Sequence, residues 1–269
     1  MTTDLDAAAV RGTRALVVEN DASDDARLLG SWLTDAGLDL AVVRPHAGDP
    51  LPPDLDGYAA LVVLGGAQNA YPDADGTPGA PWFPRLEGLL RKAVRYRVPT
   101  LAVCLGAQIL ARAHGGAVER STAGPEIGVG VVARRDAADT DPLFGTVPFA
   151  PLVVQWHHDE IVALPAGAVL LAASTRYPCQ AFRVGSAAWG VQFHIECDTE
   201  MFAAWAIDGV DVLLELGYDP VGTLAAVDAA MPDVAEVWQP FAERFAAVAL
   251  GRLAGDTDAA SRQLPLLGR

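Results

Sequence analysis

The stretch PTLAVCLGAQILA, residues 99–111, decides the fold of this chain. Thr100–Val103 is a short apolar run of the kind that forms a strand buried on both faces of a parallel sheet. Leu105–Ala113 is predicted to be a helix, so Cys104 stands at a strand-to-helix junction, with Gly106 two positions later. This arrangement is typical of a nucleophile elbow, a strained turn that lifts a reactive side chain above the edge of the sheet.

The surroundings predicted for Cys104 favour reactivity. The N-terminus of the following helix offers unpaired backbone N–H groups and the positive end of the helix dipole. Both stabilise a thiolate, which is the nucleophilic form of cysteine. A free cysteine is also among the residues most often buried as a small apolar side chain. Residues 102–106 alone leave both interpretations open.

The chain before this stretch alternates between strand and helix patterns, which predicts βαβ units. The predicted strands are Ala15–Glu19, Leu38–Val43 and Ala59–Leu64, and the predicted helices are Ala26–Ala36 and Arg85–Tyr96. Together with residues 99–113 they indicate an α/β fold, with an open, mostly parallel central sheet flanked by helices.

Beyond Gly115 the apolar runs become shorter and favour the strands of a mixed sheet. These runs are Val129–Ala133, Leu152–Trp156, Ala168–Ala173, Gln180–Val184 and Ala188–Phe193. Residues 198–250 are predicted to be helical, with a break near Pro232, because proline removes a helical hydrogen bond. The aromatic residues of this region are expected to pack on the sheet rather than to form a dimer contact. Residues 13–250 are predicted to form one domain, with loose ends at 1–12 and 251–269.

The composition restricts the class of partner. The formal net charge is −15, so phosphate backbones and anionic lipid surfaces are repelled. The three cysteines are an odd number, which suits a reducing compartment better than a disulfide framework. No apolar run is long enough to span a bilayer, and the acidic N-terminus does not resemble a signal peptide. We therefore expect a cytoplasmic protein that binds neither nucleic acid nor membranes and, lacking phosphate-loop and metal-ligand motifs, uses no cofactor or metal.

Two further elements carry chemistry. In GVQFHIE, residues 190–196, His194 and Glu196 point to the same face of an extended segment, because side chains alternate with a period of two. The carboxylate can then orient one imidazole nitrogen while the other faces a nucleophile, although an ordinary surface pair is the alternative. Gly65-Gly66 ends a buried strand, where backbone N–H groups can approach a ligand closely, as an oxyanion hole requires. A plain turn is the alternative there.

The motifs VLGGAQNAY, PTLAVCLGAQILA, QWHHDEIVALP and GVQFHIE follow one another along the chain. Together they resemble those of the class I, triad-type glutamine amidotransferases, in particular stand-alone proteins similar to the amidotransferase domain of GMP synthase. The resemblance covers roughly residues 59–197 and implies a flavodoxin-like fold. It also implies that Cys104 attacks the side-chain amide of glutamine, that His194 moves the proton and that Glu196 orients His194. A glutamyl thioester would form, ammonia would leave, and water would release glutamate.

The same resemblance assigns further roles. The backbone N–H groups of Gly66 and Leu105 would form the oxyanion hole. Gln108, with Gln155, Trp156 and His157, would hold the α-amino and α-carboxyl groups of the substrate. Trp156 stands where the GMP-synthase type usually has a small polar residue, so a γ-glutamyl hydrolase or peptidase acting on larger leaving groups is an alternative. A non-catalytic glutamine-binding or regulatory subunit is a third hypothesis, and an ammonia-accepting synthetase is a candidate partner.

Overall fold

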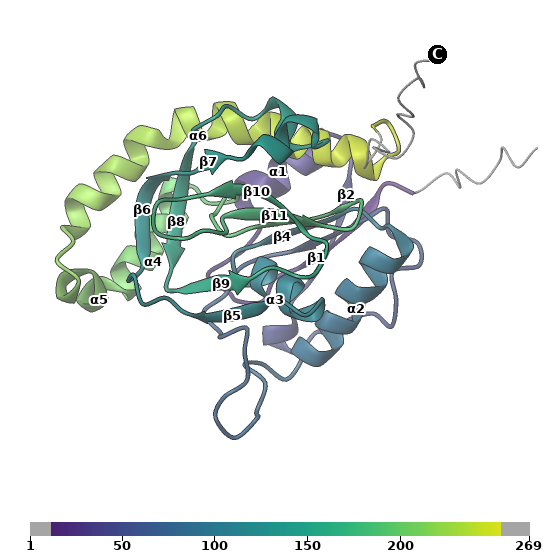
Figure 1. Ribbon diagram of the computed structural model, residues 1–269, viewed down its shortest axis with the longest axis horizontal. Helices are drawn as coiled ribbons and strands as arrows, with labels where there is room; N and C mark the ends of the chain where they lie inside the picture. Colours follow the sequence, from purple (N-terminus) through teal and green to yellow (C-terminus); the bar gives the residue numbers. More distant parts are fainter. Residues whose placement is uncertain (1–11, 254–269) are drawn as a thin grey trace, which may run out of the picture.

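A central sheet of eight strands organises the computed structural model, which describes residues 12–253 (Figure 1). The strand order is β2-β1-β3-β4-β12-β11-β10-β7. The mutually parallel strands are β1 (Arg14–Val18), β2 (Asp39–Val43), β3 (Ala60–Val63), β4 (Thr100–Val103) and β12 (Ala188–Val191). The antiparallel strands are β11 (Ala181–Val184), β10 (Val169–Ala173) and β7 (Ala133–Arg134). The predicted open, mostly parallel sheet flanked by helices is confirmed, with an antiparallel extension at one side.

Helices cover both faces of this sheet, and the alternation of side chains along β1 explains why. Ala15 and Val17 belong to the core shared with α1 (Arg27–Asp35) and α6 (Pro220–Ala249). Leu16 and Val18 belong to the core shared with α2 (Phe83–Tyr96) and α3 (Leu105–Ala113). In Figure 1 these two pairs of helices lie on opposite sides of the sheet. The apolar run of β1 after Arg14 is therefore buried on both faces of the sheet.

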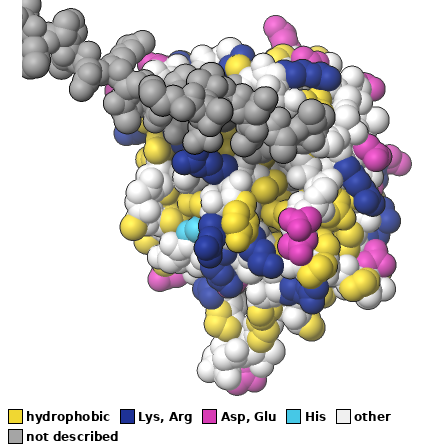
Figure 2. All heavy atoms as spheres, turned by 90° about the vertical axis from the view of Figure 1, so that its right-hand side faces the viewer, with side chains coloured by type: hydrophobic (Ala, Val, Ile, Leu, Met, Phe, Trp, Pro, Cys, Tyr) yellow, Lys and Arg dark blue, Asp and Glu magenta, His cyan; other side chains and the backbone are white. Residues whose placement is uncertain are grey.

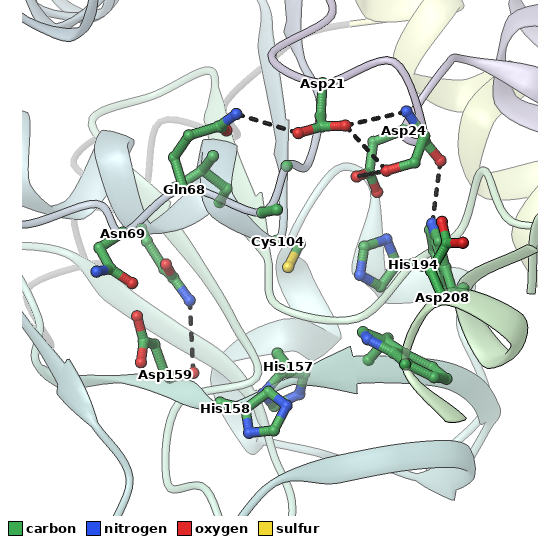
Figure 3. A pocket seen from close by; sticks show the side chains of 18 of the residues that line it. Asp21, Asp24, Gln68, Asn69, Cys104, His157, His158, Asp159, His194 and Asp208 are labelled. Atoms are coloured by element: carbon green, nitrogen blue, oxygen red, sulfur yellow. Dashed lines mark hydrogen bonds between the residues drawn. The ribbon is translucent and has the colours of Figure 1, made fainter. Parts of the chain in front are cut away.

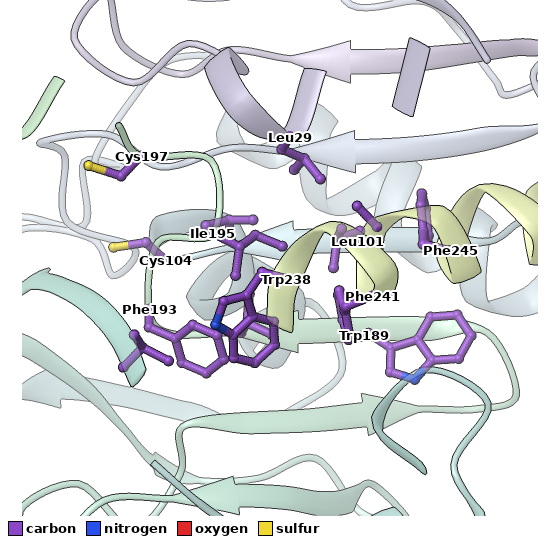
Figure 4. Packing of buried hydrophobic residues seen from close by; sticks show 14 of the residues in the cluster. Leu29, Leu101, Cys104, Trp189, Phe193, Ile195, Cys197, Trp238, Phe241 and Phe245 are labelled. Atoms are coloured by element: carbon purple, nitrogen blue, oxygen red, sulfur yellow. The ribbon is translucent and has the colours of Figure 1, made fainter. Parts of the chain in front are cut away.

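The prediction of a helix break near Pro232 is wrong, because α6 runs unbroken through Pro232 and Pro240. Both prolines lie on the exposed face of the helix, where water can satisfy the carbonyl groups that lose their N–H partners. The opposite face carries buried side chains, among them Trp238, which packs between Phe193 and Phe241 (Figure 4). The aromatic residues of α6 thus pack into the core.

The second half of the chain departs from a single mixed sheet. β5 (Ala117–Arg120) pairs with β9 (Asp159–Ala163), and β6 (Glu126–Val131) pairs with β8 (Leu152–His157). These are separate two-stranded sheets. The predicted strand Leu152–Trp156 and most of the predicted strand Val129–Ala133 therefore lie outside the central sheet, and the prediction of one mixed sheet is wrong for them. The remaining elements are α4 (Thr199–Asp208), α5 (Val210–Glu215) and the 3₁₀ turns Pro45–Ala47, Asp136–Thr140 and Phe144–Thr146.

The order β1-β3-β4-β12 decides where a site can form. These four neighbouring strands are parallel, so the segments that follow them meet at one edge of the sheet. The segments contain Asp24, Gly65-Gly66, Cys104 and His194-Ile195-Glu196 respectively. Residues from four distant parts of the chain are thereby brought together.

The surface of the protein carries charges of both signs and one projecting loop. Basic and acidic side chains are interspersed on the face shown in Figure 2, and the loop between β3 and α2 projects from its lower end. No helix within residues 12–253 is long and apolar enough to cross a membrane. The predicted loose ends lie outside the described residues, apart from Gly12 and residues 251–253.

Candidate active site

Cys104 occupies a strained turn between β4 and α3. Its backbone has φ 49° and ψ −111°, a conformation that residues with a side chain rarely adopt. The turn is held by a hydrogen bond from the Cys104 N–H to the carbonyl oxygen of Val191, 2.8 Å long. A Cβ atom on Gly106 would lie 2.3 Å from the Val63 carbonyl oxygen, so only glycine lets the helix start this close to β3. These features form the nucleophile elbow expected from the sequence.

His194 and Glu196 follow β12 in an extended segment. Nδ1 of His194 lies 2.6 Å from Oε1 of Glu196, and both side chains are almost completely buried. Ile195 between them points into the core (Figure 4), which is what a period of two requires. The His194 N–H donates to the Val154 carbonyl, 2.9 Å away, so that β8 fixes the backbone of this segment.

The electrostatics of His194 suit a base beside a thiol. Burial alone would lower the pKa of His194, but the charges of Glu196 and Cys104 outweigh it and raise this pKa well above its ordinary value. Among the described residues Nε2 of His194 has no hydrogen-bond partner. Figure 3 shows the imidazole and the Cys104 sulfur facing the same cleft. The second imidazole nitrogen is therefore available for proton transfer.

The two residues predicted for the oxyanion hole flank the sulfur. Leu105 is the first residue of α3, so its N–H has no acceptor within the helix. Gly66 faces it, since a Cβ on Gly66 would lie 3.0 Å from Cδ2 of Leu105. Both residues line the cleft next to Cys104. Their role as an oxyanion hole stays a prediction.

Three of the four predicted substrate contacts line the cleft, namely Gln108, Trp156 and His157. Burial lowers the pKa of His157 to about 3, so its imidazole is neutral at physiological pH. Gln155 does not line the cleft. Its amide lies in a buried network, 3.2 Å from Glu126 and 2.6 Å from Nε2 of His157. The expected direct contact of Gln155 with substrate does not fit this geometry, because its side chain is buried and hydrogen-bonded to His157 instead of lining the cleft.

Several residues of the cleft were not predicted. Asp24 is 6% exposed and lies in the loop after β1, next to His194. Trp205 of α4 packs on His194 with ring centroids 4.7 Å apart. Arg120 and Asp159 face each other across the β5–β9 pair and line the far side of the cleft. Asp159 lies in the quoted motif QWHHDEIVALP but was not assigned a role there, and the other three residues lie outside the quoted motifs, so that only the strand order and the small sheets place them here.

Asp24, His194 and Glu196 offer ligand atoms that all lie within 4.8 Å of one another. A metal ion bound to Nδ1 of His194 would break the hydrogen bond between His194 and Glu196. The absence of a metal site stays a prediction.

The comparisons with known proteins agree with this description. The family model of class I glutamine amidotransferases matches residues 18–204, and the chain belongs to this family. The crystal structure of a glutamine amidotransferase from Thermotoga maritima is similar, with a TM-score of 0.76 and 26% identity over 87% of this chain and 97% of that one. The flavodoxin-like fold and the resemblance found in the sequence are thereby confirmed.

The relatives differ in the reaction that their names describe. Gamma-glutamyl peptidase 5 of Arabidopsis thaliana is 32% identical over 55% of this chain and 57% of its own length. The glutamine amidotransferase-like protein YfeJ of Salmonella typhimurium is 30% identical over 73% of this chain and 79% of its own length. A GMP synthase of Christiangramia forsetii is 33% identical over 54% of this chain, but the match spans only 26% of that protein. General amidotransferase or hydrolase chemistry is common to these names.

Proposed function

We propose that this protein hydrolyses the side-chain amide of a γ-glutamyl group through a covalent thioester on Cys104. The observation that carries the proposal is the position of Cys104 in a strained elbow, facing a histidine that is hydrogen-bonded to a buried glutamate. A nucleophile, a base and an orienting carboxylate are the parts that acyl transfer by cysteine requires.

The reaction runs in two halves. The Cys104 thiolate attacks the amide carbon, and the N–H groups of Gly66 and Leu105 stabilise the oxyanion. The C–N bond then breaks, His194 gives its proton to the leaving nitrogen, and a γ-glutamyl thioester remains. In the second half His194 takes a proton from water, the hydroxide attacks the thioester, and glutamate leaves as the thiolate is restored. Glu196 stabilises the imidazolium form of His194 in both halves.

The glutamyl end of the substrate has a candidate site on the side of the cleft away from His194. Arg120 supplies a cation for the α-carboxylate, and the Asp159 carboxylate faces it as a partner for the α-ammonium group. Figure 3 places Asn69 and Asp159 on one side of the sulfur and His194 and Asp208 on the other. The leaving group therefore lies between Cys104 and α4.

The size of the cleft favours leaving groups larger than ammonia. Its volume is about 660 Å³, which corresponds to about 20 water molecules, whereas glutamine has about ten non-hydrogen atoms. On the leaving-group side the wall is aromatic, with Trp156 packed on Phe202 and Trp205. The names of two Arabidopsis relatives, gamma-glutamyl peptidases 4 and 5, point the same way. Glutamine itself remains the second candidate, as an amidotransferase that passes ammonia to a synthetase.

The experiment that tests the proposal compares glutamine with γ-glutamyl dipeptides and γ-glutamyl anilides on the purified chain. Release of glutamate together with the amine, faster from the conjugates than from glutamine, is the expected result. Faster release from glutamine would favour the amidotransferase. Saturable binding that stabilises the fold without products would indicate a non-catalytic binding subunit and contradict the proposal.

Removing the aromatic wall should alter the choice of substrate. In Trp156→Ser we expect kcat/KM for a γ-glutamyl conjugate to fall by about ten-fold while glutamine is affected less, because an apolar contact acts on the leaving group alone. Steady-state kinetics with both substrates give the ratio. Phe149→Ser is the control, since Phe149 is exposed and does not line the cleft. An equal loss on both substrates would show that Trp156 supports the fold rather than specificity.

Neutralising the orienting carboxylate should remove most of the rate. In Glu196→Gln we expect kcat to fall by roughly 10³-fold, because a neutral amide no longer stabilises the imidazolium form of His194. Glu200→Gln, which removes a mostly exposed carboxylate four residues away, should retain activity. Thermal melting of both variants separates loss of chemistry from loss of fold. Comparable turnover in the two variants would contradict the assigned role of Glu196.

A further inference from the structure

The loop after β1 brings a second carboxylate to His194. Asp24 lies at the end of this loop, and the only described hydrogen bond of its carboxylate comes from Oγ of Ser23, 3.2 Å away. Among residues 12–253 no lysine or arginine forms an ion pair with it. A buried carboxylate without a cationic partner is costly, so its position calls for a reason.

Gly65 allows this approach. A Cβ atom on Gly65 would lie 2.9 Å from Oδ1 of Asp24 and 3.3 Å from Cε1 of His194. The missing side chain thus leaves space for the Asp24 carboxylate, one oxygen of which lies within 4.8 Å of a ring nitrogen of His194 and of a carboxylate oxygen of Glu196. The backbone of Gly65 is not in the left-handed region, so close approach is the reason for glycine here.

The loop itself is held in place. Asn20 donates to the Leu64 carbonyl, 2.8 Å away, and accepts from Nε1 of Trp82 at 3.0 Å. Nε1 of Trp205 donates to the carbonyl of Ser23 at 3.0 Å, which ties the loop to α4. The position of Asp24 is therefore fixed by β3, α2 and α4 together.

We infer that Asp24 is a positioning residue that acts through His194, as a second counter-charge that stabilises the imidazolium paired with the Cys104 thiolate. The inference rests on the proposed function and extends it. Glu196 binds the imidazole at Nδ1, and Asp24 adds a second negative charge within 4.8 Å of a ring nitrogen. The ionised form of Asp24 therefore favours the ion pair that attacks the substrate.

The groups facing Asp24 set the pH at which it changes charge. Burial raises the pKa of Asp24 to about 6; the charge of His194 opposes this, while Glu196 and Asp21 add to it. Ser23 on the same loop donates a hydrogen bond. Cys197, beyond Glu196, also faces Asp24, and burial keeps its own pKa above the ordinary range. Asp24 thus loses its charge in a mildly acidic solution.

The first test measures the reactivity of Cys104 without any substrate. We expect the rate of alkylation of Cys104 by iodoacetamide, followed by mass spectrometry, to be about equal in wild type and Asp24→Asn at pH 5. At pH 8 the wild type should react roughly ten-fold faster, so the ratio of the two rates rises through pH 6. The buried Cys179 and Cys197 react slowly because burial raises the pKa of both thiols.

A matched control and a second variant sharpen the test. Asp25→Asn removes the neighbouring charge, which is paired with Arg27 outside the cleft. The wild-type and Asp25→Asn proteins should therefore be alkylated at equal rates at every pH. Gly65→Ala should displace Asp24 and lower the rate at pH 8, and adding Asp24→Asn to it should cost little more, because both changes remove the same interaction. A wild-type-to-Asp24→Asn ratio that does not change with pH, or fully additive losses, would overturn the inference.

Thermal stability distinguishes the proposed role of Asp24 from a purely structural one, because the two predict opposite changes in the melting temperature of Asp24→Asn. Because the folded pKa of Asp24 is raised, the residue stabilises the fold below pH 4, and this contribution is lost as the pH rises through about 6. Asp24→Asn should therefore melt higher than wild type at pH 8, by roughly 5 °C, and the difference should shrink toward pH 5. A lower melting temperature at pH 8 would contradict the inference. If wild type hydrolyses no γ-glutamyl compound, the proposed function fails, whereas the alkylation ratio still decides the role of Asp24.

Discussion

Cys104→Ala should lose turnover of every γ-glutamyl substrate by roughly 10⁴-fold or more, while its melting temperature stays close to that of wild type. Alanine retains the Cβ atom, so it meets the same backbone strain at φ 49° that cysteine meets. Only the sulfur is removed, and with it the covalent step. No neighbouring group can replace it, because the other side chains at the elbow offer no nucleophile.

The measurement pairs steady-state glutamate release with rapid acid quenching and mass spectrometry of the protein. Wild type should accumulate a species heavier by a γ-glutamyl group on Cys104, and Cys104→Ala should not. Cys179→Ala is the matched control, because this buried cysteine packs in the core on the α2 and α3 side and is absent from the cleft. Glutamate release by Cys104→Ala at a rate near that of wild type would exclude the thioester mechanism.

Gly106→Ala is the second change with a large expected effect, and it acts through geometry. The new Cβ atom would lie 2.3 Å from the carbonyl oxygen of Val63, so α3 must move away from β3. Overpacking of this kind typically costs about 1–3 kcal/mol of unfolding free energy. A shift of the helix start also moves the sulfur relative to His194, and a displacement of about 1 Å can lower the rate about 100-fold.

Gly88→Ala in α2 is the control for this variant. Nothing lies within 4 Å of a Cβ built there, so the same substitution should stabilise the helix by roughly 0.5–1 kcal/mol. Chemical denaturation gives both unfolding free energies, and the glutamate assay gives the rates. A Gly106→Ala variant as stable and as active as wild type would show that the elbow has room to relax.

The sequence predicts the parts of this protein that repeat a simple physical pattern. β3 and β4 consist almost wholly of apolar residues, and His194 and Glu196 are separated by one apolar residue, so each pattern can be recognised within a few residues. β5 was not predicted because only Val118 of its four residues is buried. The prediction of a helix break at Pro232 was wrong because the effect of a proline depends on which face of α6 it occupies. That face is decided by contacts with residues far away in the chain.

Asp24 shows the same limit within the site. It belongs to the acidic stretch 19–25, which has the composition of an ordinary solvated loop. Its proximity to His194 depends on the neighbourhood of β1, β3, β4 and β12, which no local pattern encodes. Gly65 was noted as the end of a strand, but the contact it permits is visible only in three dimensions.

The place of β12 in the sheet has a consequence for how the protein is made. This strand fills the position between β4 and β11, both of which leave the ribosome before it. Until residue 191 is available, β4 is an unpaired edge on that side, which is a liability for aggregation. His194 and Glu196 follow β12 directly, so a nascent chain holds the Cys104 thiol apart from its base. The closing of the sheet during biosynthesis is thus also the step that brings the proposed catalytic residues together.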